Sequence, residues 1–204
     1  GSACPVDLMP ANSKNINDII GQSYDMVVCA GISAKKWYAN ANPESDLMEI
    51  NNLLNILKKA FINKFVLIST IDVYNVINTK CHEDYIPDIP NTNHAYGKNR
   101  LYVEKTIENR YSDHLIVRLP GLFGFGLKKN IIYDYLSNNL KEININSSYQ
   151  WYDIADLFKD INKLLNQNNK IVNLFTEPIS NADLLNLFEK YYGVNIKIIN
   201  DNPV

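Results

Sequence analysis

Tyr96 and Arg100 are the residues of this sequence whose types and spacing first suggest chemistry. They stand four positions apart in the stretch 94–104, and on a helix side chains at that spacing lie on the same face. A tyrosine has an ordinary pKa of about 10, which makes it a poor base at neutral pH. A neighbouring cation favours the phenolate and lowers that pKa. The pair is therefore a candidate acid–base device, although the same spacing is common on surface helices without any function.

Continuous apolar runs predict the buried parallel strands that would position this pair. We expect strands at 26–30, 65–68 and 115–119, with Gly31, Ser69-Thr70 and Pro120 following them. Helical spacing of apolar residues predicts the intervening helices, at 44–61 and from about 96 to 110.

The rest of the chain continues the alternation of strands with helices, which indicates an α/β fold with a mainly parallel sheet. A long polar loop is expected over 74–95. The other predicted elements are a short helix within 12–22, helices at 129–140, 154–165 and 181–192, and strands at 171–175 and 195–199. No interdomain linker is evident, so we expect one domain over 1–204, with substrate-side elements in 121–204.

Right-handed crossovers place the carboxyl ends of all parallel strands at one edge of the sheet, where ligands bind. Gly31, Thr70 and Pro120 should therefore meet at that edge. Tyr96 opens the helix between the second and third strands and should begin nearby. The Thr70 hydroxyl could then hydrogen bond a substrate oxygen while Tyr96 exchanges a proton with it and Arg100 supplies the neighbouring charge.

These segments, in this order, resemble the extended short-chain dehydrogenase/reductases. That family is the NAD(P)-dependent epimerase/dehydratase group, whose members act on nucleotide-activated sugars. The resemblance covers roughly residues 5–185 and implies a Rossmann-like fold. The matching positions are 29–32, 50–51, 67–74, 95–101 with Glu104, and 117–120 with Gly124.

The resemblance also implies roles for individual residues. Thr70 takes the Ser/Thr role, Tyr96 the acid–base role and Arg100 that of its electrostatic partner. The cofactor, NAD or NADP, would contact Asp7 and Leu8 at the adenine, Ala30 and Gly31 at the phosphates and ribose, Asn51, and the backbone of Pro120 at the nicotinamide. The run 118–130 is similar to bacterial members associated with surface-polysaccharide sugars. A homodimer through the helix at 96–110 is possible.

Three departures from the family pattern narrow these expectations. Arg100 stands where the family has lysine, and arginine keeps the charge but is effectively never deprotonated. Ile71 and Asp72 stand where family dehydratases carry Asp and Glu, which favours an epimerase or a ketoreductase. No Gly-x-x-Gly-x-x-Gly segment precedes Met26. We therefore expect that the N-terminal cofactor-binding part is truncated in this chain, that another chain fills its place, or that the N-terminus is rearranged.

Simpler interpretations of the same residues remain open. In the first of them, Thr70 only caps a turn and Asp72 only makes a side-chain-to-backbone turn bond. In the second, the whole chain is a degenerate, catalytically inactive relative that acts as a binding or interaction protein. Cys29, Trp151 and Tyr152 are expected to be core residues.

Composition limits the other classes of function. A formal net charge of -2 gives no reason to expect nucleic acid or an anionic membrane as partner. No run approaches the length that spans a bilayer. Three widely spaced cysteines argue against a disulfide framework and favour a cytoplasmic, reducing compartment. His82 lies beside Cys81 and Glu83, but that cluster is too compact for a metal site, and we expect no metal.

Overall fold

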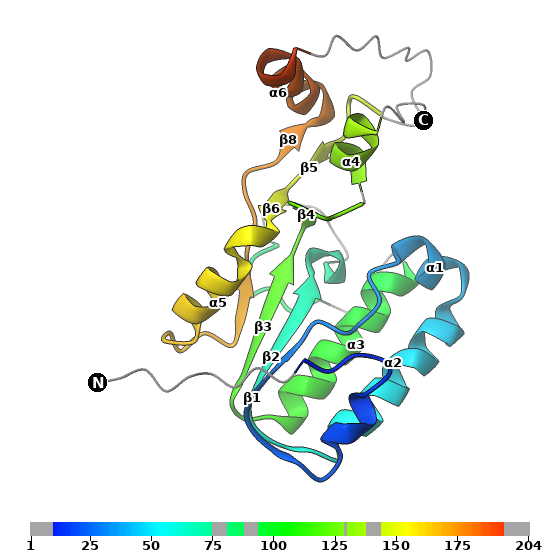
Figure 1. Ribbon diagram of the computed structural model, residues 1–204, viewed down its shortest axis with the longest axis vertical. Coiled ribbons are helices and arrows are strands. Elements are labelled where there is room, and N and C mark those ends of the chain that lie inside the picture. The colour runs from blue at the N-terminus through cyan, green and yellow to red at the C-terminus, as the bar shows by residue number, and fades with distance from the viewer. Residues whose placement is uncertain (1–9, 75–80, 88–93, 129, 138–143, 194–204) are drawn as a thin grey trace.

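A four-stranded parallel sheet forms the centre of the computed structural model, which describes residues 10–74, 81–87, 94–128, 130–137 and 144–193 (Figure 1). Its strands are β1 (Ser23–Cys29), β2 (Phe61–Thr70), β3 (His114–Leu119) and β7 (Ile171–Asn173), in the order β1-β2-β3-β7. Each neighbouring pair is parallel. The predicted α/β fold class with a mainly parallel sheet is confirmed.

Two long helices, α2 (Pro43–Leu57) and α3 (Ala95–Arg110), cover one face of the sheet (Figure 1). Pro43 stands in the first turn of α2, where its missing N–H costs no hydrogen bond. The short helix α1 (Lys36–Ala41), which the sequence did not predict, packs against both of them. Buried residues of α2 recur at helical spacing and pack onto the alternate residues of β2 that point to this face.

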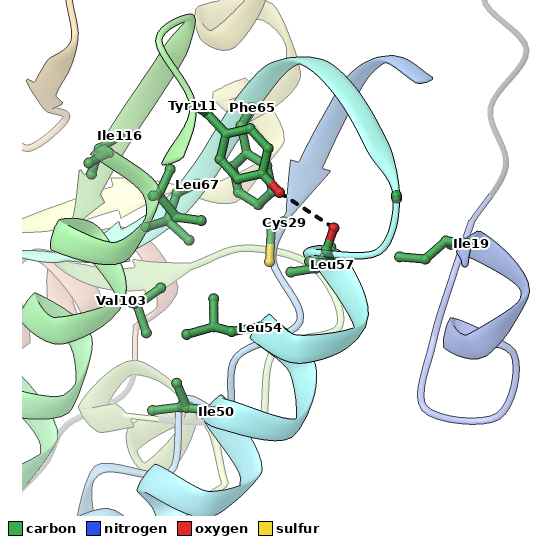
Figure 2. Packing of buried hydrophobic residues seen from close by; sticks show 12 residues of the cluster. Ile19, Cys29, Ile50, Leu54, Leu57, Phe65, Leu67, Val103, Tyr111 and Ile116 are labelled. Carbon is green, nitrogen blue, oxygen red and sulfur yellow. Dashed lines mark hydrogen bonds between the residues drawn. The ribbon is translucent and has the colours of Figure 1, made fainter. Parts of the chain in front are cut away.

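Figure 2 shows the core between these helices and the sheet. Phe65 of β2 stacks on Tyr111 with ring centroids 4.7 Å apart, and the Tyr111 hydroxyl donates to the Leu57 carbonyl oxygen at 3.5 Å. Cys29 is buried here, as predicted, and burial raises the pKa of its thiol. This packing joins the ends of α2 and α3 to the middle of the sheet.

The opposite face is covered by α5 (Leu157–Leu164), which follows the short helix η4 (Ile154–Asp156). Ile161 and Leu164 pack against the residues of β2 and β3 that alternate with those of the first core. Tyr152, predicted as a core residue, is buried in the same cluster. Trp151 is also buried.

A smaller region lies beyond the carboxyl ends of the strands (Figure 1). It contains the pairs β4 (Gly121–Phe123) with β6 (Trp151–Asp153) and β5 (Ser148–Tyr149) with β8 (Ile179–Ser180). The helices α4 (Asn130–Leu136) and α6 (Asn181–Tyr192) meet where Tyr135 stacks on Phe188, with centroids 4.5 Å apart. None of the helices in the described ranges is long and apolar enough to cross a membrane.

The prediction that the first strand is buried on both faces is wrong. Met26 and Val28 of β1 are 38% and 48% exposed. Within the described residues β1 pairs only with β2 and forms one edge of the sheet. Its apolar run indicated a strand correctly, but an apolar run cannot distinguish an edge strand from a central one.

Other differences concern boundaries. Residues 12–22 form only a short 3-10 helix, η1 (Ile16–Ile19), and β2 begins at Phe61 because α2 already ends at Leu57. The helix predicted at 154–165 is divided into η4 and α5, and α6 has the predicted bounds. The strand predicted at 195–199 and the predicted contacts of Asp7 and Leu8 lie outside the described residues.

A buried ion pair fastens α3 to the sheet. Glu104 of α3 and Arg118 of β3 are each 1% exposed, with 2.7 Å between Arg118 Nη2 and Glu104 Oε2. Ser69 donates its hydroxyl to Glu104 Oε1 at 2.5 Å, and Arg118 Nη1 donates to the Tyr74 hydroxyl at 3.0 Å. Tyr74 also hydrogen bonds the Asn173 side chain. Four elements thus share one polar network, in which each charge has a partner.

We predict that Glu104→Gln lowers the free energy of unfolding by about 3–5 kcal/mol, because it leaves the Arg118 charge buried without a counterion. Urea denaturation followed by circular dichroism measures this loss. The matched control is Glu108→Gln, one turn further along α3, where Glu108 pairs with Lys105 in a more exposed position. Its cost should stay below about 1 kcal/mol. Equal losses in the two variants would contradict the importance of the buried pair.

Candidate active site

The carboxyl ends of the three longest strands bring three predicted site residues to one edge of the sheet. The register pairs Cys29 with Leu67 and Thr70 with Leu119. Gly31 follows β1, Thr70 ends β2 and Pro120 follows β3, so all three lie at the same level. Ala30 and Gly31 are exposed there, and Thr70 and Pro120 are half-buried. This shared edge was expected from the sequence.

Helix α3 begins against the same edge and carries Tyr96 in its first turn. A Cβ on Gly97 would lie 2.1 Å from the carbonyl oxygen of Asp72, so the helix packs directly on the backbone of η2 (Ile71–Val73). The Tyr96 N–H donates to Asn40 Oδ1 at 2.9 Å, which ties the first turn to α1. Backbone packing therefore places Tyr96 beside the segment that follows Thr70.

His94 is the N-cap of α3. Its Nδ1 accepts a hydrogen bond from the Gly97 N–H at 3.0 Å, so its proton is on Nε2, which lies 3.8 Å from Asp72 Oδ1. Burial and then the charge of Lys36 lower the pKa of His94, while Asp72 opposes them in part. A neutral imidazole is the form that can act as this cap.

Thr70 is held by its neighbour Asp72. The Thr70 hydroxyl accepts from the Asp72 N–H at 3.1 Å and donates to Asp72 Oδ2 at 3.2 Å. The other carboxylate oxygen of Asp72 pairs with Lys36 Nζ at 2.6 Å. The turn cap considered for Thr70 is thus present, and its catalytic role stays a prediction. Asp72 connects Thr70 to the exposed cation of α1.

Arg100 lies beside Tyr96, as helical spacing predicted, but its guanidinium is bound elsewhere. Its Nη1 and Nη2 lie 2.8 and 3.0 Å from the two carboxylate oxygens of Asp46, and Nη2 also donates to the Ser33 carbonyl oxygen. Arg100 is 4% exposed and Asp46 2%. The guanidinium carbon stands 4.4 Å from the centre of the Tyr96 ring. Arg100 therefore stacks on the phenol while an anion neutralises its charge.

Sequence reasoning missed Asp46, although a signal was available. Asp46 occupies the face of α2 that continues through Ile50, Leu54 and Leu57, all of them buried. An acidic residue on an apolar helix face must find a cation or a hydrogen-bond donor when it is buried. Asn99 donates to Asp46 Oδ2 at 2.9 Å as well. Burial would raise the pKa of Asp46, but the bonds from Arg100 and Asn99 outweigh it and lower that pKa.

The pKa of Tyr96 is raised above its ordinary value. Burial is the main cause, and the charge of Arg100 offsets only part of the rise. The carboxylates of Asp72 and Asp46 add to it. The phenol is 7% exposed. At neutral pH Tyr96 is therefore a neutral phenol that can donate a proton or a hydrogen bond.

Asn51 is not joined to this group by any contact among the described residues. It accepts a hydrogen bond from the Tyr102 hydroxyl at 3.0 Å, between α2 and α3. Its predicted place on the cofactor side stays a prediction. No group of three or more His, Cys, Asp or Glu side chains within the described ranges could hold a metal ion.

Comparison with known proteins places this geometry in context. The family model described as "NAD dependent epimerase/dehydratase family" matches residues 3–174. No curated protein matches the chain.

Solved structures share the fold at low sequence identity. The RMD of Pseudomonas aeruginosa, complexed with NADPH, has a TM-score of 0.71 and 20% identity, over 87% of this chain and 68% of that one. TunA, an NAD-dependent NDP-hexosamine 5,6-dehydratase, has a TM-score of 0.69 and 16% identity, over 90% of this chain and 64% of that one. The UDP-glucose 4-epimerase of Thermotoga maritima, solved with UDP-glucose, has a TM-score of 0.69 and 17% identity, over 88% of this chain and 65% of that one. This chain thus spans about two thirds of their length.

We predict that Gly97→Ala destabilises the protein by about 1–3 kcal/mol, because the new methyl group collides with the Asp72 carbonyl oxygen. Helix propensity alone would favour alanine by about 1 kcal/mol, so the sign of the change tests the contact. Thermal denaturation measures it. Gly31→Ala is the control, since its Cβ would meet only Leu53 Cδ2 at 3.8 Å, and it should change stability by less than about 0.5 kcal/mol. A stabilised Gly97→Ala variant would refute the close packing.

Proposed function

Because this chain belongs to the NAD dependent epimerase/dehydratase family, as its motifs predicted, we propose that it binds NAD or NADP and acts on a nucleotide-activated sugar as an epimerase or ketoreductase. One observation supports this proposal most directly. Thr70 and the first turn of α3, which carries Tyr96, lie together at the edge of the sheet where Gly31 is exposed. Names of proteins with the same fold support the substrate class, since they include an NDP-hexosamine dehydratase and a UDP-glucose epimerase.

The residues at the strand ends fit a dinucleotide in part. Ala30 and Gly31 expose their backbone at the end of β1, and without a side chain Gly31 lets a phosphate or ribose approach closely. The backbone near Pro120 would face the nicotinamide. Arg100 is not available for a contact with the cofactor, because its Nη atoms already bind Asp46 and Ser33. Asp7, Leu8 and Asn51 complete the proposed cofactor contacts.

The proposed chemistry divides between the cofactor and the chain. A bound nicotinamide supplies or accepts a hydride at the sugar carbon. Tyr96 exchanges a proton with the oxygen on that carbon, and Thr70 hydrogen bonds the same oxygen after turning its hydroxyl away from Asp72. A dehydratase reaction is disfavoured, because Ile71 has no acid and Asp72 is paired with Lys36.

The substrate side is proposed to include the loop 121–128 and the region of α4 and α6. Phe125 is fully exposed between Gly124 and Gly126, whose φ angles of 141° and 83° are accessible mainly to glycine. An exposed aromatic side chain at this edge could cover a sugar or a base. From the resemblance of the run 118–130 we further propose a role in surface-polysaccharide biosynthesis in the cytoplasm.

A second candidate is a degenerate relative that binds a ligand or a partner without catalysis. The observation that favours it is the ion pair of Arg100 with Asp46, which removes the cation that would activate the tyrosine. Turnover of a nucleotide sugar by the chain would exclude this candidate.

We predict that millimolar NAD(H) or NADP(H) raises the melting temperature. At a concentration of about one hundred times Kd, linkage stabilises the folded state by about 2.7 kcal/mol, which corresponds to roughly 5–10 °C for a chain of this size. Differential scanning fluorimetry with the four dinucleotides measures the shift. If none of them changes the melting temperature, the dehydrogenase mechanism is untenable for this chain.

Tyr96→Phe is the matched variant for that experiment. It should keep the thermal shift, because the proposed cofactor contacts do not include this hydroxyl, and it should abolish turnover of a nucleotide sugar. Undiminished turnover in Tyr96→Phe would remove Tyr96 from the mechanism while leaving cofactor binding intact.

A further inference from the structure

Asp46 is a buried carboxylate that the proposed mechanism does not use. It stands in the first turn of α2, 2% exposed, and makes hydrogen bonds only to side chains of α3 among those described. Two come from Arg100, in the paired geometry that suits a carboxylate and a guanidinium, and one comes from Asn99. The lowered pKa of Asp46 keeps it ionised at neutral pH.

Asp46 affects Tyr96 through Arg100, because Arg100 is the cation that stacks on the Tyr96 ring. With Asp46 bound through both oxygens, the Arg100–Asp46 pair carries no net charge. The other charges facing this part of the site are Asp72 of η2 and Lys36 of α1, which pair with each other, and His94 before α3, which is neutral. No described neighbour therefore leaves an uncompensated positive charge beside the phenol.

We propose that Asp46 is a positioning residue that neutralises Arg100 and so, together with the burial of the ring, keeps Tyr96 protonated, which suits the site to carbonyl reduction rather than to hydroxyl oxidation at neutral pH. This inference rests on the proposed function and selects ketoreductase over epimerase within it. An epimerase must first remove a proton from a sugar hydroxyl, for which a phenolate is the competent form. Carbonyl reduction needs a proton donor instead, and a neutral phenol is one.

The reductive step balances as follows. A bound nicotinamide dinucleotide in its reduced form would supply the hydride, with its electron pair, that the carbonyl carbon takes up. The O–H bond of Tyr96 breaks and its proton bonds to the carbonyl oxygen, which gives an alcohol and leaves a phenolate. Proton uptake from solvent restores the phenol, and its raised pKa drives that uptake.

The test is a pH titration of Tyr96 by NMR in protein labelled with ¹³C at the tyrosine ζ carbon. The chain has 13 tyrosines, and Tyr96→Phe identifies the resonance. In the native sequence Tyr96 should remain a phenol up to at least about pH 10, the ordinary tyrosine value. Asp46→Asn releases the Arg100 charge beside the ring and should lower the Tyr96 pKa by about 1–3 pH units.

Asn99→Ala is the matched control, because it removes the hydrogen bonds that an uncharged amide donates to Asp46 and to the Pro43 carbonyl oxygen without changing any charge. It should leave the Tyr96 pKa within about 0.3 pH units of the native value while lowering the melting temperature, because two buried hydrogen bonds are lost. A merely structural Asp46 would make the two variants behave alike.

Two results would overturn the inference: a native Tyr96 that ionises below its ordinary pKa of about 10, or a Tyr96 pKa that is the same in Asp46→Asn as in Asn99→Ala. If Asp46→Asn fails to fold, the double variant Asp46→Asn/Arg100→Gln removes both charges of the pair and should leave the Tyr96 pKa within about 0.3 pH units of the native value; a larger shift would show that the native pair is not neutral toward the phenol and would overturn the inference. The titration needs no cofactor. Failure of the dinucleotides to bind would therefore overturn the proposed function, whereas the titration separately decides how Asp46 acts on Tyr96.

Discussion

The ion pair between Glu104 and Arg118 is the interaction on which the rest of the structure depends. Two charges with 1% exposure are costly to remove from water, and here each is satisfied by the other and by Ser69 or Tyr74. Ser69 directly precedes Thr70, and Arg118 lies two residues before Pro120. The pair therefore fixes the ends of β2 and β3 relative to α3, and with them the positions of Thr70, Pro120 and Tyr96.

Two buried ion pairs hold helix α3, and the helix supplies the cation of one pair and the anion of the other. Arg100 reaches Asp46 on α2, and Glu104, one turn later, reaches Arg118 on β3. The helix thus presents a cation to its neighbouring helix and an anion to the sheet. Charged contacts require particular partners, whereas apolar packing tolerates sliding, so these pairs fix the register of α3. Tyr96 depends on that register for its place beside Asp72.

The sequence was sufficient for whatever follows from local periodicity. It predicted the strands that carry Gly31, Thr70 and Pro120 and the helix that carries Tyr96, because apolar runs and helical spacing are local signals. It did not predict the ion pair of Asp46 with Arg100, which joins residues 54 positions apart. The exposure of Val28 also escaped prediction, because burial depends on neighbouring strands. A partner that lies far along the chain leaves no signal in the local pattern of the sequence, so neither feature could be predicted from it.

The exposed side of β1 has a consequence for the behaviour of this chain in concentrated solution. Within the described residues, one edge of β1 has no strand beside it, and Met26 and Val28 project apolar surface next to it. An edge of this kind is a template for pairing with the strand of another molecule. Asp25, in the middle of the strand, is exposed and places a negative charge where two such edges would meet. Colloidal stability should therefore depend on that carboxylate.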